Sequence, residues 1–227
     1  GFPFAFHTVG SAMAVKARQY MRVGGMNRRQ AGEDFYFIQK LAQLEGYFTL
    51  NNTTVYPSPR PSLRVPFGTG AAISRLLKSP GEHLLTYNFN AFRELRSLFS
   101  TALNLFHCDT QESKKYYNDL PDGLRSFISE KDWILKINEI NGNTSGYESF
   151  LKRFFGWFNM FRIVKYLNHV HIGIYEKQPV PDSAILLLAS AGHQINSIDP
   201  PDLLQWFRSK EKDLNYSSLK SSCPPEE

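Results

Sequence analysis

The feature that most limits how this chain can fold is a change in residue pattern near residue 71. Before that point, four prolines between residues 57 and 66 exclude a long regular element, because proline lacks an amide N–H and constrains the residue before it. After it, apolar residues recur at the three- and four-residue spacing of amphipathic helices. The sequence therefore predicts a helical subdomain over residues 71–216, with helices at 71–77, 81–106 (interrupted near Asn88), 123–141, 147–170, 182–191 and 201–215.

The first 70 residues show a different pattern of shorter elements. Segments 2–9 and 47–56 are rich in β-branched and aromatic residues, which predicts strands. Segments 16–23 and 33–46 predict two short helices, since Gly24 and Gly25 follow the first and Gly46 ends the second. The predicted fold class is mainly α with a small α/β portion over residues 1–70. The polar tail 217–227, which holds two prolines, is predicted to be frayed.

Composition excludes several classes of protein. The 227 residues are 42% hydrophobic and 14% aromatic, which is too apolar for a disordered chain. The longest apolar run, residues 184–191, is far too short to span a bilayer, and no signal-peptide pattern opens the chain. Two cysteines, Cys108 and Cys223, cannot form a disulfide framework or a zinc site. The sequence therefore predicts a cytoplasmic location.

The net charge of +5 is unevenly distributed along the chain. Residues 1–78 contain ten lysines and arginines against three acidic residues, a net charge of +7, whereas residues 79–227 have a net charge of −2. A basic segment of this kind favours a phosphate, nucleotide or nucleic-acid partner. Nucleic acid is the weaker of these interpretations, because no basic stripe or stacking motif accompanies the charge. We therefore expect a small anionic ligand rather than nucleic acid.

Glu33 and Asp34 are the candidate catalytic pair. They follow Gly32 at the predicted start of an amphipathic helix, where the helix dipole favours ionised carboxylates. An ionised carboxylate in a fixed position is what a general base requires. Acidic residues are also favoured in the first turn simply because they stabilise the helix, so a purely structural role is the alternative.

The surrounding motifs resemble the acceptor-side half of a bacterial-type family 2 inverting glycosyltransferase with the A-type fold. The resemblance covers residues 4–56 and rests on a small-residue segment (10–14), a short helix ending in Val23-Gly24-Gly25-Met26, a basic loop, and Gly32-Glu33-Asp34-Phe35 opening the next helix. Met26 stands where the family usually has an aromatic residue. The resemblance implies that Asp34 is the catalytic base and that Glu33 lines the acceptor site.

The family's other half is absent from this sequence. The resemblance implies a preceding nucleotide-binding half that ends in an Asp-x-Asp motif and holds a divalent metal, Mg or Mn. The closest substitutes, Glu130-Lys131-Asp132 and Glu211-Lys212-Asp213, lie in helical patterns typical of solvated surface. We therefore expect the chain to be the C-terminal part of a longer enzyme and inactive by itself, with Gly1 compatible with a tag remnant. The implied ligands are a nucleotide-sugar donor and a carbohydrate or lipid-linked acceptor.

Further basic residues are candidates for binding the donor diphosphate or the acceptor. Arg28 and Arg29 lie in the loop before the Glu-Asp pair, and Arg60 and Arg64 precede a glycine-containing turn. Guanidinium groups bind phosphate well, although solvated surface arginines explain the second pair equally. His7, on the first predicted strand, is a candidate for the same role, with a hydrogen-bonded structural histidine as the alternative.

An aromatic run at residues 154–161, flanked by basic residues, has two interpretations. It is typical of a buried helix, and it also fits a helix at a membrane surface, which would place the protein at the inner face of the membrane. The alternative to the enzyme as a whole is a non-catalytic helical interaction module whose basic face binds anions.

Overall fold

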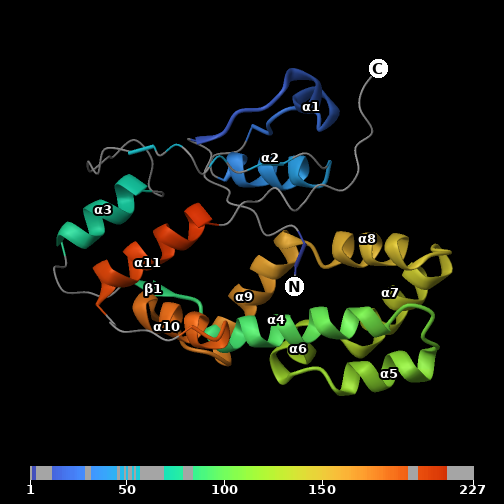
Figure 1. The fold of residues 1–227 in the computed structure, drawn as a ribbon. Helices are drawn as coiled ribbons and strands as arrows, with labels where there is room; N and C mark the ends of the chain where they lie inside the picture. Colours follow the sequence, from blue (N-terminus) through green and yellow to red (C-terminus); the bar gives the residue numbers. More distant parts are fainter. Residues whose placement is uncertain are drawn as a thin grey trace. The chain divides into compact units, whose positions relative to one another are not determined.

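The computed structural model describes residues 2–3, 12–28, 32–44, 47–48, 50, 53, 55–56, 69–78, 84–193 and 199–213. These residues are mainly helical and contain one two-stranded sheet, which confirms the mainly α class (Figure 1). The chain divides into two compact units. The helical unit comprises residues 1–5 and 84–195, and the front unit comprises residues 6–83 and 196–227. The predicted domain limits at residues 70 and 216 stay a prediction, and the predicted tail 217–227 lies outside the described residues.

The helical unit is built from short helices that pack against one another. Its elements are β1 (Leu85–Thr86), α4 (Phe89–Thr101), the 3-10 helix η2 (Ala102–Asn104), α5 (Thr110–Asn118), α6 (Asp122–Phe127), α7 (Glu130–Gly142), α8 (Tyr147–Trp157), α9 (Met160–Gly173), β2 (Gln178–Pro179) and α10 (Val180–Ser190). Helix α7 packs against α5 and α8, and α6 packs against α4 and α9 (Figure 1). Strands β1 and β2 pair antiparallel, with Leu85 opposite Pro179 and Thr86 opposite Gln178.

Polar side chains start four of these helices. Asn88, Asp109, Ser129 and Asn159 precede α4, α5, α7 and α9, and each side-chain oxygen accepts a backbone N–H of the first turn. These bonds satisfy amide groups that have no partner inside the helix. Asp109 and Glu112 form a reciprocal capping box. The caps explain why the unit consists of many short helices.

Aromatic side chains fill the core of the helical unit. The largest fully buried ones are Trp133, Phe150, Phe154, Phe158 and Tyr166. Their edge-to-face and tilted contacts are the arrangements that aromatic rings prefer. Two of these residues, Phe154 and Phe158, belong to the aromatic run, and Phe155 of the same run is also buried, so that run is core. Membrane contact stays a prediction that these side chains do not support.

The core also encloses one carboxylate. Glu94 on α4 is 8% exposed and accepts the hydroxyl groups of Tyr166 and Tyr175, each at 2.6 Å. Gly123 on α6 lies so close that an added Cβ would sit 2.3 Å from Glu94 Oε2. A buried charge is tolerated only when its oxygens are hydrogen-bonded, and here both are.

The front unit contains four described helices. They are α1 (Ala17–Arg22), α2 (Glu33–Ala42), α3 (Thr69–Lys78) and α11 (Pro200–Asp213). These match the predictions at 16–23, 71–77 and 201–215. Helix α2 ends at Ala42 rather than at Gly46, because Gln43 and Leu44 close the last turn.

The predicted strand at 47–56 is wrong at every position that the structure describes, since none is in a strand. Phe48 and Tyr56 are 74% and 89% exposed, so the aromatic content of this segment does not reflect burial in a sheet. Of the predicted strand at 2–9, only Phe2 and Pro3 are described, and neither is in a strand.

Long predicted helices are divided in the structure. Within the prediction at 81–106 the interruption expected near Asn88 is confirmed, because β1 precedes Asn88 and α4 begins after it, followed by η2. The prediction at 123–141 gives way to α6 and α7, with extended backbone at Ile128 between them. The prediction at 147–170 gives way to α8 and α9, which meet at Phe158 and Asn159. Helix α5 was not predicted. The helix starts that were not predicted, those of α5, α7 and α9, each have a polar N-cap residue. The apolar spacing continues through the breaks and therefore does not reveal them.

Across the described part of the chain, helices are too short or too polar to cross a bilayer.

Candidate functional site

The predicted catalytic pair lies in the first turn of α2. Gly32 precedes the helix with a positive φ of 69°, and its carbonyl oxygen accepts the Tyr36 N–H at 3.1 Å. Glycine tolerates this left-handed conformation without strain, so the chain can turn sharply into the helix. Glu33 and Asp34 follow directly, and both are half-buried. The positive end of the helix dipole favours their ionised forms.

The Asp34 carboxylate has a defined orientation. Its Oδ1 accepts the backbone N–H of Phe35 at 2.7 Å. This bond uses an amide that has no partner inside the helix and limits rotation of the Asp34 side chain. Adjacent helix positions point about 100° apart, so Glu33 and Asp34 face different directions.

Helix α2 is positioned by its contact with α1. The Tyr20 and Phe37 rings lie 5.4 Å apart between centroids. Gly24 and Gly25, which end α1, both have a φ of 73°, as the sequence predicted for a helix terminus. An added Cβ on Gly25 would lie 3.0 Å from the Tyr20 hydroxyl oxygen, whereas one on Gly24 would meet nothing. The second glycine thus allows Tyr20 to close over the connection.

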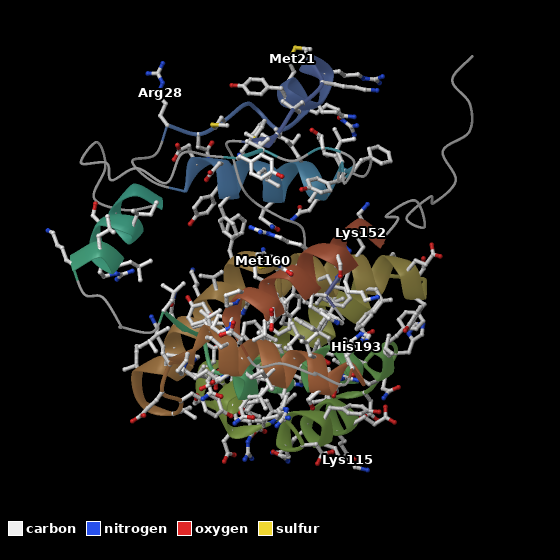
Figure 2. The ribbon with its side chains drawn as sticks, turned by 60° about the vertical axis from the view of Figure 1, so that its left-hand side comes forward. Met21, Arg28, Lys115, Lys152, Met160 and His193 are labelled. Carbon is white, nitrogen blue, oxygen red and sulfur yellow. The ribbon has the colours of Figure 1, made fainter. Side chains whose placement is uncertain are left out.

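The loop between these helices carries one described candidate arginine. Arg28 is exposed and projects away from the ribbon in Figure 2. Within the part of the chain that the structure describes, Arg28 forms no ion pair with Glu33 or Asp34. The loop is linked to α2 instead by Lys40 Nζ, 3.5 Å from Asn27 Oδ1. His7, Arg29, Arg60 and Arg64 lie outside the described residues.

Gln39 is a polar residue that sequence reasoning missed. It is 2% exposed on the buried side of α2, and its Nε2 has no hydrogen-bond partner among the described residues. A buried unpaired amide is costly, so it marks either a strained position or a group that binds something. In the sequence Gln39 directly follows Phe37 and Ile38, and this apolar context is the signal that could have indicated its burial.

The metal expected from the resemblance finds no ligand group here. Among the described residues, no three histidine, cysteine, aspartate or glutamate side chains are arranged to hold a metal ion. Glu130 instead forms an ion pair with Lys114 at 2.9 Å. The Asp132 backbone N–H donates to the hydroxyl oxygen of Ser129, the N-cap residue of α7. Both contacts are those of a helix surface, as predicted for Glu130-Lys131-Asp132. The other substitute, Glu211-Lys212-Asp213, lies within α11.

Comparison with known proteins returned no protein-family model, no curated sequence and no solved structure that matches this chain. The site consists of an oriented carboxylate at a helix start, with an exposed arginine in the preceding loop.

Proposed function

We propose that this chain is the acceptor-side part of an inverting glycosyltransferase, which moves a sugar from a nucleotide-sugar donor to an acceptor hydroxyl. The observation that carries the proposal is the oriented Asp34 carboxylate behind Gly32 at the start of α2. The support comes from local geometry together with the resemblance over residues 4–56.

The proposed reaction is a single displacement. The acceptor hydroxyl attacks the anomeric carbon of the donor sugar, and the bond from that carbon to the nucleotide diphosphate breaks. Asp34 takes the proton from the hydroxyl as the new bond forms, because an un-ionised sugar hydroxyl is a weak nucleophile. Glu33, which faces another direction, would bind the acceptor. Arg28 would offset the negative charge that develops on the leaving diphosphate.

A divalent metal, Mg or Mn, would add positive charge at the diphosphate. By the resemblance, its ligands would belong to an Asp-x-Asp motif in the preceding nucleotide-binding half. That half is also the proposed partner of this chain, and a carbohydrate or lipid-linked molecule is the proposed acceptor.

The test is an Asp34→Asn substitution in the natural protein that contains this chain together with the proposed nucleotide-binding half. Loss of a general base typically lowers the rate by about 100- to 10,000-fold. We therefore expect sugar transfer to fall by that factor while nucleotide binding, measured by calorimetry, is unchanged. The matched control is Arg18→Gln, an exposed residue on α1, which should transfer at the parent rate. Parent-level transfer by Asp34→Asn would remove Asp34 from the mechanism.

The alternative function is a helical interaction module with an anion-binding basic face. The observation that favours this alternative is that the helical unit forms a hydrophobic core from its own residues. A panel of nucleotide sugars with Mn²⁺ separates the two proposals. The enzyme proposal expects no turnover by the isolated chain and turnover by the longer protein, whereas the interaction module expects none from either.

A further inference from the structure

Both ring nitrogens of His171, in the last turn of α9, are bonded to backbone groups. Nδ1 lies 2.6 Å from the Leu167 carbonyl oxygen, one turn earlier. Nε2 accepts the Asn88 backbone N–H at 2.8 Å. A carbonyl oxygen can only accept and an amide N–H can only donate, so the two bonds require a proton on Nδ1 and a lone pair on Nε2. The structure therefore holds His171 as one neutral tautomer.

His169, two residues earlier on the same helix, is a natural comparison. Its Nε2 lies 3.1 Å from the Ser126 hydroxyl oxygen, which itself donates to the Gly123 carbonyl at 2.8 Å. The hydroxyl oxygen can accept a bond from a protonated imidazole without any rearrangement. A second proton is thus compatible with the bonds of His169 and incompatible with those of His171.

The Asn88 amide that bonds His171 lies at a structural junction. Asn88 caps α4, and its Nδ2 donates to the Glu176 carbonyl at 3.1 Å. The neighbouring Tyr87 hydroxyl donates to Asn168 on α9 at 2.9 Å, and Ser183 on α10 donates to the Tyr87 carbonyl at 3.4 Å. The segment around Asn88 therefore joins β1 to α9, to the link before β2, and to α10.

Two tyrosine rings lie beside His171, and the charged residues Glu176 and Lys177 follow it in the link between α9 and β2. The Tyr87 and Tyr175 rings lie 5.1 and 6.3 Å from the imidazole ring, and the Lys177 ammonium lies 5.7 Å from the Tyr87 ring. Across the described residues, His171 belongs to no ion pair.

Carboxylates on the packed elements are directed elsewhere. Glu94 on α4 already accepts from Tyr166 and Tyr175, and Asp182 in the first turn of α10 is exposed. A proton on His171 Nε2 would thus face the Asn88 N–H, and two donors that face each other repel.

We propose that protonation of His171 controls the packing of β1, β2 and α10 on α4 and α9. While the ring is neutral, its Nε2 holds the Asn88 amide and keeps β1, β2 and α10 packed on α4 and α9. When Nε2 takes up a proton, the bond to the Asn88 N–H is lost and these three elements separate from the helices. The change is local, because the hydrogen bonds that the structure describes for Tyr87, Asn88, His171 and Ser183 do not reach α5, α7 or α8.

The test is an NMR titration of the full chain, labelled with ¹⁵N, from about pH 8 to about pH 5, the range in which histidine changes charge. We expect the His171 nitrogen shifts at the upper pH to show the Nδ1–H tautomer. As Nε2 becomes protonated, the Asn88 amide resonance should move with those of residues 84–88 and 176–190. Amide exchange in those segments, corrected for its intrinsic pH dependence, should accelerate about tenfold or more.

Two substitutions accompany the titration. His171→Gln offers an amide oxygen to the Asn88 N–H without a titrating group, so the response of residues 84–88 and 176–190 should disappear. His169→Gln should leave that response intact. The proposal is overturned if His171 stays neutral down to about pH 5, the lower end of the range in which histidine changes charge. It is also overturned if His171 gains a proton while the Asn88 resonance stays fixed, or if α5 and α7 respond together with β1 and α10. If His171→Gln does not fold, the titration of the parent chain decides the question by itself.

Discussion

At the scale of single residues, burial and the Glu94 carboxylate together set the acid–base behaviour of two tyrosines. Tyr166 and Tyr175 both donate their hydroxyl protons to its carboxylate. Burial first, and then the bond and charge of Glu94, raise the pKa of Tyr175 to about 12 and raise the pKa of Tyr166 as well. Both hydroxyl groups therefore keep their protons well above the pH at which an exposed tyrosine loses its own.

This shift makes a prediction about alkaline stability. Because the pKa of Tyr175 is raised in the folded protein, its contribution to the free energy of unfolding is fully present below about pH 10, the ordinary tyrosine value. The contribution is lost as the pH rises from there through about 12, since the unfolded chain releases the proton first. Urea unfolding between these limits, followed by tryptophan fluorescence, measures the loss.

The Glu94→Gln variant isolates the carboxylate's part in this behaviour. Removing the charge should lower the pKa of Tyr175 toward its ordinary value, though not fully, because burial is the larger cause. Tyrosinate absorbance during an alkaline titration reports the change, and Tyr175→Phe identifies the signal. An unchanged titration in Glu94→Gln would contradict this account.

At the scale of elements, the connection from α1 to α2 depends on two glycines with different requirements. Gly24 and Gly25 share a φ of 73°, which side-chain-bearing residues adopt only with strain. Gly25 alone is also crowded, since an added Cβ would lie 3.0 Å from the Tyr20 hydroxyl oxygen. The Tyr20 ring contacts Phe37, so the crowding reaches the buried face of α2.

The two glycines therefore form a matched pair for mutation. Gly24→Ala should lower the free energy of local unfolding of α1 and α2 by about 1 to 2 kcal/mol, which is the cost of the left-handed conformation for a residue with a side chain. Gly25→Ala should cost about 1 kcal/mol more, because the Tyr20 ring must also move. Native-state hydrogen exchange of the α1 and α2 amides measures both. Equal effects of the two substitutions would show that the Tyr20 contact is unimportant.

At the scale of the whole molecule, the start of the chain belongs to the core of the helical unit. The Phe2 ring lies 5.8 Å from the Phe99 ring and 5.9 Å from the Phe155 ring. These contacts join residue 2 to α4 and α8, far away in the sequence. The helical unit is therefore made from two separate stretches of the chain.

Phe2→Ala should accordingly destabilise the helical unit. We expect the free energy of unfolding, followed by the fluorescence of buried Trp133, to fall by about 1 to 3 kcal/mol, since a half-buried aromatic residue loses its ring contacts. Phe48→Ala is the control, because Phe48 is 74% exposed and should change stability by less than about 0.5 kcal/mol. A Phe2→Ala protein as stable as the parent would mean that the ring contacts contribute nothing.

Features that depend on neighbouring residues could be predicted from the sequence. The helices at 17–22, 33–42 and 69–78, the positive φ of Gly24 and Gly25, and the position of Glu33 and Asp34 in a first helical turn all follow local rules. Even the breaks before α7 and α9 carried a local signal, because Ser129 and Asn159 are typical caps. The apolar spacing that crosses those breaks obscured it.

Features that depend on distant residues could be decided only by the tertiary structure. Nothing near Phe2, Glu94 or His171 in the sequence indicates that their partners are Phe155, Tyr175 and Asn88. The exposure of Phe48 shows the same limit, because aromatic content predicted a strand whose pairing depends on residues elsewhere. The sequence by itself thus determined a mainly helical chain with an acidic pair at one helix start. Burial and bonding between residues far apart decided which side chains became core, which carboxylate was enclosed and which histidine was held neutral.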